Sequence, residues 1–119
     1  MIEQLIHITV VKHLEARAIK GLYWFHPANG EKRNIVTAKR LKRMGVKPGI
    51  ADLVFVLPFQ GCGSHGVVAF MEIKSEKGRL SPKQKEFRDK CARLGWSYKI
   101  VRNLDEAIYV LRQWGALKN

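Results

Sequence analysis

Two apolar runs joined by a glycine-rich loop constrain the fold of this chain more than any other feature. Residues 51–58 read ADLVFVLP and residues 67–74 read VVAFMEIK, with the nine-residue loop PFQGCGSHG at 58–66 between the strand cores. Short runs rich in β-branched residues on both sides of such a loop predict a β-hairpin. In the second run Phe70, Glu72 and Lys74 share one face of an extended strand. This strand therefore ends in two opposite charges, either because it leaves the core for solvent or because the charges form a site.

Four helices and two more strands are expected around this hairpin. Apolar residues at helical spacing predict an amphipathic helix ending at Gly21, namely Ile2, Leu5, Ile6, Val10, Leu14 and Ala18. Residues 22–26 (LYWFH) read as a short strand, and residues 35–45 (IVTAKRLKRMG) as a strongly basic helix. Residues 97–102 (SYKIVR) read as the last strand.

Capping motifs mark the start of the last two helices. Ser81 is followed by Pro82 and, three residues after Ser81, by Gln84, which predicts a capping box and a helix reaching about Leu94. Asn103 and Glu106 have the same spacing before the helix DEAIYVLRQW at 105–114. The order α-β-α-β-β-α-β-α predicts an α/β fold, a small mixed β-sheet flanked by helices, in one domain over residues 1–119.

The charge of the chain favours a polyanionic partner. Its 119 residues include 22 Lys and Arg against 10 Asp and Glu, a formal net charge of +12, which makes nucleic acid the first candidate and an anionic membrane surface the second. No apolar run approaches the roughly 20 residues that span a bilayer, and no signal peptide opens the chain. Two cysteines, Cys62 and Cys91, are too few for a disulfide framework. We therefore expect a cytoplasmic protein without membrane contact.

Three motif matches fail on their context. Gly61 to Gly66 spells GxGxxG, but a strand follows where a dinucleotide loop needs a helix, so no nucleotide cofactor is expected. Cys62 and His65 could supply two zinc ligands, whereas a structural zinc site needs four. Residues 38–51 resemble a helix-turn-helix, but an apolar strand occupies the place of the recognition helix.

Clustered basic residues are candidates for contacts with phosphates. Lys and Arg side chains displace counterions from a nucleic-acid backbone, although a basic helix face can also be merely solvated. The candidates lie in and around the second helix and near the start of the third: Arg33, Lys39, Arg40, Lys42, Arg43, Lys47, Lys77, Arg79 and Lys83.

The hairpin brings two carboxylates together. If it is symmetric about Cys62, paired residue numbers sum to 124, so Val54 faces Phe70 and Asp52 faces Glu72. Like charges with Cβ atoms ~5 Å apart on neighbouring strands are destabilising unless a cation neutralises them. Lys74 offers one such cation. A divalent cation such as Mg²⁺ is the other, since it is held by one or two carboxylates, several waters and phosphate oxygens.

Asp52 followed by Glu72-Ile73-Lys74 resembles the D…(D/E)xK signature of the PD-(D/E)xK nucleases, with Ala51 in place of the usual preceding proline. The surrounding stretches, residues 38–58, 71–87 and 94–108, are similar to a VRR-NUC (virus-type replication-repair nuclease) domain. The resemblance runs from Glu3 to about Ile108 and is to the stand-alone phage and bacterial type. It implies a restriction-endonuclease-like core, in a bacterial cell or a phage-infected host.

The resemblance also implies residue roles. Asp52, Glu72 and the backbone carbonyl of Ile73 would bind Mg²⁺ or Mn²⁺, and Lys74 would orient the attacking water and steady the developing charge. Gln84 matches a site-supporting glutamine and can be a capping residue as well. Glu3 matches an acidic residue that completes the site, and equally suits the N-terminal dipole of its helix. Residues 29–31 (Asn-Gly-Glu) depart in order from the family pattern, so Glu31 is given no role.

The expected activity is that of a metal-dependent endonuclease hydrolysing DNA phosphodiester bonds. Stand-alone relatives imply a homodimer acting on branched DNA such as Holliday junctions. The alternative is a non-catalytic, basic nucleic-acid-binding module on the same scaffold, in which the acidic pair is structural. The four histidines, His7, His13, His26 and His65, are expected to be structural or exposed because a hard cation favours oxygen ligands.

Overall fold

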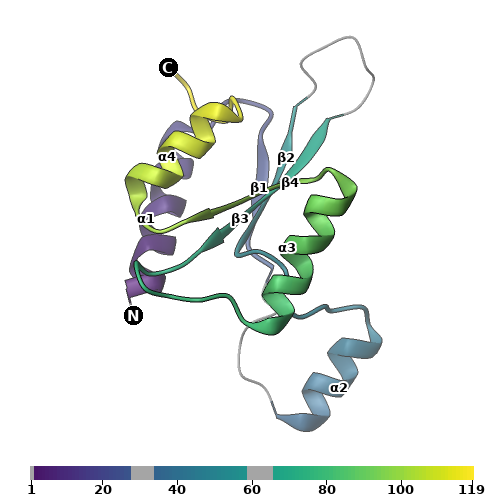
Figure 1. The fold of residues 1–119 in the computed structure, drawn as a ribbon. Coiled ribbons are helices and arrows are strands. Elements are labelled where there is room, and N and C mark those ends of the chain that lie inside the picture. Colours follow the sequence, from purple (N-terminus) through teal and green to yellow (C-terminus); the bar gives the residue numbers. More distant parts are fainter. Residues whose placement is uncertain (1, 28–33, 59–65) are drawn as a thin grey trace.

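The computed structural model describes residues 2–27, 34–58 and 66–119. The element order matches the one expected from the sequence (Figure 1). The helices are α1 (Ile2–Arg17), α2 (Ile35–Arg43), α3 (Pro82–Leu94) and α4 (Leu104–Gln113), and the strands are β1 (Tyr23–Phe25), β2 (Leu53–Leu57), β3 (Val67–Ile73) and β4 (Ser97–Val101).

The four strands form one mixed sheet in the order β1-β2-β3-β4. The first two pairings are antiparallel, and β3 and β4 run parallel. In the hairpin Val54 pairs with Phe70 and Leu57 with Val67, so the register predicted from the sequence is confirmed. The glycine-rich loop at 59–65, with Cys62 and His65, lies outside the described residues.

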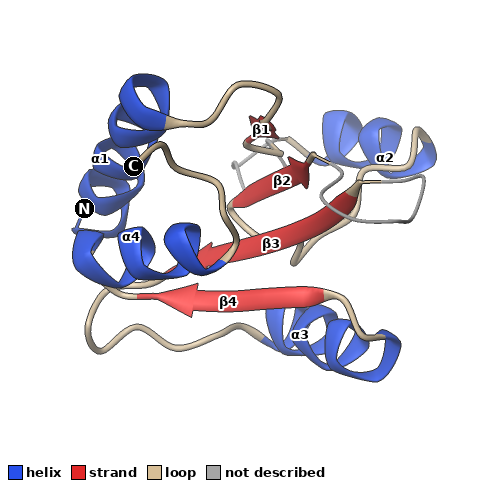
Figure 2. Cartoon of the chain, turned by 90° about the horizontal axis from the view of Figure 1, so that it is seen from above, coloured by secondary structure: helices blue, strands red, loops and turns tan. Residues whose placement is uncertain are grey.

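Helices cover both faces of the sheet (Figures 1 and 2). The α1 and α4 helices pack on one face, where Leu14, Phe55, Met71 and Leu111 belong to the fully buried core. The α3 helix lies on the other face, where the ring of Phe87 meets Phe70 edge to face at 4.9 Å between centroids. Both faces of the C-terminal half of β3 are therefore covered, and Met71, Glu72 and Ile73 are all buried.

The start of α3 forms as predicted, whereas the start of α4 does so in part. The Ser81 side chain accepts a hydrogen bond from the Gln84 backbone, and the Gln84 side chain accepts one from the Ser81 backbone. At α4, Asn103 accepts from the Glu106 backbone, but the Glu106 carboxylate accepts instead from the backbone N–H of Arg102. The second half of the predicted box is therefore shifted by one residue.

The first helix differs from expectation at both ends. It stops at Arg17 rather than near Gly21, because Ala18 forms a β-bridge with Leu117 near the C-terminus. Its apolar residues Ile2 and Leu5 are 63% and 65% exposed, so the buried stripe begins only further along. Among the described residues, no helix combines the length and the hydrophobicity needed to cross a bilayer.

Candidate active site

Asp52 and Glu72 meet where β2 begins and β3 ends. Asp52 directly precedes β2, and its Oδ2 accepts a hydrogen bond of 2.7 Å from the backbone N–H of Ile73. Glu72 is the penultimate residue of β3. The hairpin register extended by one pair places these two residues opposite each other, as expected from the sequence. One backbone hydrogen bond thus fixes the carboxylate of Asp52 against the end of the neighbouring strand.

Glu72 is almost completely buried, at 1% exposed, and is only partly satisfied. Its Oε2 accepts a hydrogen bond of 3.2 Å from Gln84 Nε2 and lies 3.9 Å from Lys74 Nζ. Its Oε1 has no hydrogen-bond partner in the described part of the chain. Lys74, at 8% exposed, is also buried. An orphaned carboxylate oxygen beside a second acid is a feature that requires an explanation.

The surroundings of Glu72 disfavour its charged form. Burial is the main cause that raises its pKa, to about 9, and the negative charge of Asp52 acts in the same direction. Lys74 opposes the rise, while Glu3 adds to it. A carboxyl group shifted this far by burial and by a neighbouring acid is typical of a functional site.

Glu3 reaches the site from the first turn of α1. Its Oε2 accepts a hydrogen bond of 3.3 Å from the backbone N–H of Ser75, directly after Lys74. A Cβ atom on Gly78 would lie 2.9 Å from the same Oε2 oxygen, so a side chain at residue 78 would displace the carboxylate. The predicted group of Asp52, Glu72, Lys74, Gln84 and Glu3 is thus brought together.

Arg102 holds the loop between β3 and α3, a role that sequence reasoning missed. Its guanidinium donates to the backbone carbonyls of Ser75 at 2.7 Å and Gly78 at 2.8 Å. Arg102 follows β4 directly, and β4 pairs in parallel with β3, so the ends of both strands meet at one edge. The only sequence signal was a charged residue directly after a strand.

Two histidines also lie beside Asp52 and were missed. His26 Nδ1 is 2.5 Å from the backbone carbonyl oxygen of Asp52, and the rings of His7 and His26 meet edge to face at 4.6 Å. Burial lowers the pKa of His7, and the neighbouring His26 lowers it further. The expectation that these histidines are structural or exposed agrees with the exposure of His26 and otherwise stays a prediction.

The profile of the VRR-NUC domain matches residues 3–103, most of the chain. The chain belongs to the VRR-NUC family. A solved structure titled "VRR_NUC domain protein" is similar to it, with a TM-score of 0.72 and 26% sequence identity over 96% of this chain and 88% of that chain. A comparison with curated proteins gives no match. The family is of nuclease type, and its fold is the mixed sheet flanked by helices described above.

Eight of the nine basic residues predicted to contact nucleic acid are exposed in this VRR-NUC chain. The exposed ones among those predicted to contact nucleic acid are Lys39, Arg40, Lys42, Arg43, Lys47, Lys77, Arg79 and Lys83. Arg33 falls outside the described residues. The helix α2 lies beyond the N-terminal end of α3 (Figure 1), the end that supplies Gln84 to the site.

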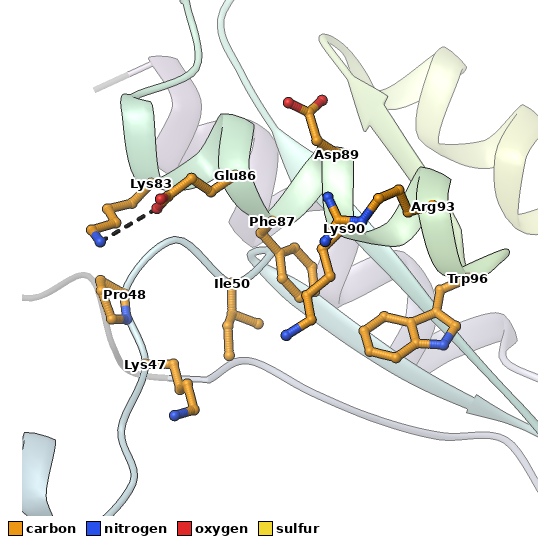
Figure 3. A pocket seen from close by; sticks show the side chains of 10 residues that line it. All are labelled: Lys47, Pro48, Ile50, Lys83, Glu86, Phe87, Asp89, Lys90, Arg93 and Trp96. Carbon is orange, nitrogen blue, oxygen red and sulfur yellow. Dashed lines mark ion pairs between the residues drawn. The ribbon is translucent and has the colours of Figure 1, made fainter.

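A groove of about 690 Å³ runs between α3 and the segment that links α2 to β2. Figure 3 shows Lys83, Phe87 and Lys90 of α3 on one side and Lys47 and Ile50 of the link on the other. Lys83 forms an ion pair with Glu86 at 3.3 Å. With Arg93 and Trp96 at one end, this groove combines cations with aromatic rings, which are the groups that bind phosphates and stack on bases.

Proposed function

We propose that this protein is a Mg²⁺- or Mn²⁺-dependent endonuclease that hydrolyses DNA phosphodiester bonds. The observation that carries the proposal is the buried Glu72 facing the half-buried Asp52, with Lys74 Nζ 3.9 Å from Glu72. Membership of a nuclease-type family supports the same activity. DNA is the substrate that fits the net charge of +12.

The acidic residues fit a hard divalent cation. The Oε1 of Glu72, which has no hydrogen-bond partner among the described residues, and the carboxylate of Asp52 offer oxygen ligands. A cation would offset the burial and the negative charge of Asp52, which together raise the pKa of Glu72. The backbone carbonyl of Ile73 and the carboxylate of Glu3 are the further candidates. When bound, Mg²⁺ or Mn²⁺ polarises the scissile phosphate and lowers the pKa of a water molecule.

The remaining side chains position the metal-binding groups and stabilise the charge that develops in the transition state. The Lys74 ammonium sits at the edge of the buried site, where an electrostatic contact with a phosphate is stronger than in water, and it steadies the negative charge that develops in the transition state. Gln84 donates to Glu72 and so fixes the orientation of that carboxyl group. Arg102 keeps the loop from Ser75 to Gly78 in place beside Glu3.

The proposed substrate is branched DNA, such as a four-way junction, cut by a homodimer. A chain of 119 residues offers little surface for recognising several duplex arms, and two-fold symmetry doubles that surface. Sedimentation at micromolar concentration is expected to give a dimer. A monomer that cuts linear and four-way DNA at the same rate would contradict this part of the proposal.

Cleavage of labelled four-way, flap and linear duplex DNA with Mg²⁺, Mn²⁺ or EDTA tests the activity. Asp52→Asn is the sharpest variant, because its amide oxygen can still accept the hydrogen bond from Ile73 while its charge is lost. We expect metal-dependent cutting by the native chain and none by this variant. Salt-sensitive binding without cutting under every metal condition would favour the non-catalytic binding module instead.

A further inference from the structure

A second group of metal-ligating side chains lies next to the acidic pair. His7 comes from α1, His26 directly follows β1, and Asp52 directly precedes β2. One ring nitrogen of each histidine and one carboxylate oxygen of Asp52 lie within 4.8 Å of one another. The hydrogen bonds of Glu72 described above do not involve either histidine.

The contact between His26 and Asp52 fixes which nitrogen of His26 is free. A backbone carbonyl can only accept, so the neutral ring must carry its hydrogen on Nδ1 to donate across the 2.5 Å contact. The lone pair is then on Nε2. A metal-binding histidine is commonly held in this way, with its other ring N–H donated to a carbonyl or carboxylate.

We propose that His7, His26 and Asp52 bind a divalent transition-metal ion of the Zn²⁺ or Co²⁺ class, at a position that shares Asp52 with the acidic site. Imidazole nitrogen suits these ions, whereas Mg²⁺ takes oxygen ligands. In a tetrahedral site with bonds of about 2.0–2.2 Å, ligand atoms are roughly 3.4 Å apart. Ion binding must therefore draw the three ligand atoms closer than the 4.8 Å within which they now lie, while His26 keeps its Nδ1 contact with Asp52.

Three protein ligands, of which only His26 is exposed, leave at least one coordination place for water or phosphate. That is the composition of a catalytic rather than a structural site, since structural zinc sites are closed by four protein ligands. Because Asp52 belongs to both positions, ions at the two positions would be neighbours, as in two-metal phosphodiesterases. A part in cleavage rests on the nuclease function proposed above, whereas metal binding by the histidines does not.

Titration of the full chain with Co²⁺, followed by visible absorption, tests the proposal. We expect a saturable band in the native protein, and at least tenfold weaker binding in His7→Asn and in His26→Asn. His13→Asn is the matched control, because His13 lies on the same helix α1 but outside the cluster, and it should bind like the native protein. Glu72→Gln should keep the band, since it removes only the acidic position.

Ring nitrogen resonances give a second readout that requires no variant. Addition of Zn²⁺ to the native protein should shift the resonances of His7 and His26 and leave that of His13 in place. Unchanged resonances, or Co²⁺ affinities in both histidine variants equal to the native one, would overturn the proposal and leave the histidines as a structural contact.

The two proposals fail separately. If Mg²⁺ alone supports cleavage while His7 and His26 bind no Co²⁺, only the second metal position is wrong. If the histidines bind Co²⁺ but no metal supports cleavage, the metal position stands and the nuclease function is wrong.

Discussion

The carboxyl group of Glu72 sets the energetics of the site at the scale of single residues. It is buried, one of its oxygens has no hydrogen-bond partner among the residues that the structure describes, and it lies close to Asp52. Burying a charge without compensation is costly, so in the absence of a cation the group keeps its proton. The raised pKa therefore predicts that stability depends on pH and that metal binding releases a proton.

The stability of the metal-free protein should fall as pH rises. The pKa of Glu72 is about 9 in the folded chain against an ordinary 4.5, so the folded state holds the extra proton between these values. Its contribution is complete below pH 4.5 and is lost as pH approaches 9. Urea unfolding in EDTA between pH 7 and 9 should show a loss of at most about 1.4 kcal/mol per pH unit.

Glu72→Gln is the control for this dependence, since it keeps the shape of the side chain and cannot ionise. The interval above pH 7 also excludes His7, whose lowered pKa affects stability only at more acidic pH. Equal slopes for the native chain and the variant would show that Glu72 is ionised in the metal-free protein, contrary to the account.

Lys74 should be essential for turnover and dispensable for folding. Lys74→Met keeps the buried aliphatic stem and removes only the ammonium. Loss of one group that stabilises transition-state charge typically lowers the rate about 10²–10³-fold, and we expect a drop of that size in initial cleavage rate. Lys99→Met, an exposed lysine on β4, is the matched control. Cleavage at the native rate by a folded Lys74→Met protein would remove Lys74 from the mechanism.

The sequence predicts that Asp52 and Glu72 meet but not that two histidines lie beside Asp52, for a physical reason. The pairing of Asp52 with Glu72 follows from strand alternation and from hairpin symmetry, both of which are local. His7 and His26 meet only because α1 packs against the sheet and brings them together at Asp52. No spacing along the chain encodes that packing.

At the scale of secondary-structure elements, the first turn of α3 links helix formation to the site. Gln84 accepts the hydrogen bond that completes the capping box and donates another to Glu72. Local motifs of this kind were readable in the sequence, and Ser81 begins the helix as predicted. The exposure of Ile2 and the shifted hydrogen bond of Glu106 could not be predicted from the sequence, because both depend on what packs nearby rather than on local propensity.

The link between α2 and β2 should depend on Gly49 more than on Gly45. Both glycines have positive φ angles, of +82° and +98°, but only at Gly49 would an added Cβ meet a neighbour, at 2.5 Å from the backbone oxygen of Lys83. Backbone strain of a non-glycine residue at positive φ costs of order 1–3 kcal/mol. We expect Gly45→Ala to lower the free energy of unfolding in urea by that amount. Gly49→Ala should be more destabilising, because the start of α3 must also move. Equal losses would mean that the link does not pack on α3 as described.

At the scale of the whole molecule, the exposed cations of α2 form the basic surface that we propose contacts DNA. The exposed cations of α2 lie beside the N-terminal end of α3, far from α1 and α4 (Figure 1). A basic surface next to the site guides a polyanion toward it and contributes affinity that is sensitive to salt. Net charge was evident from composition, whereas its distribution required the fold.

Removing three cations from α2 should weaken DNA binding and its salt dependence. Each phosphate contact contributes about 0.9 to the slope of log K against log salt, so replacement of Lys39, Lys42 and Arg43 by Ala should lower the slope by up to about 3. Fluorescence anisotropy at several salt concentrations measures it. The control replaces Lys12, Lys20 and Lys118, which carry the same charge away from α2. Equal slopes for both triple variants would contradict an interface on α2.

The central claim is that Asp52 and Glu72 hold one hard divalent cation, and calorimetric titration with Mg²⁺ tests it most directly. Mg²⁺ is the appropriate ion because it takes oxygen ligands, so the histidines beside Asp52 should not bind it. We predict one ion per chain and, at pH 7 in buffers of different ionisation enthalpy, release of a proton from Glu72. Binding should be lost in Asp52→Asn and Glu72→Gln. It should be retained in Glu76→Gln, because Glu76 is an exposed acid in the loop between β3 and α3. Binding to Glu72→Gln with the native affinity, or binding without proton release, would contradict the account.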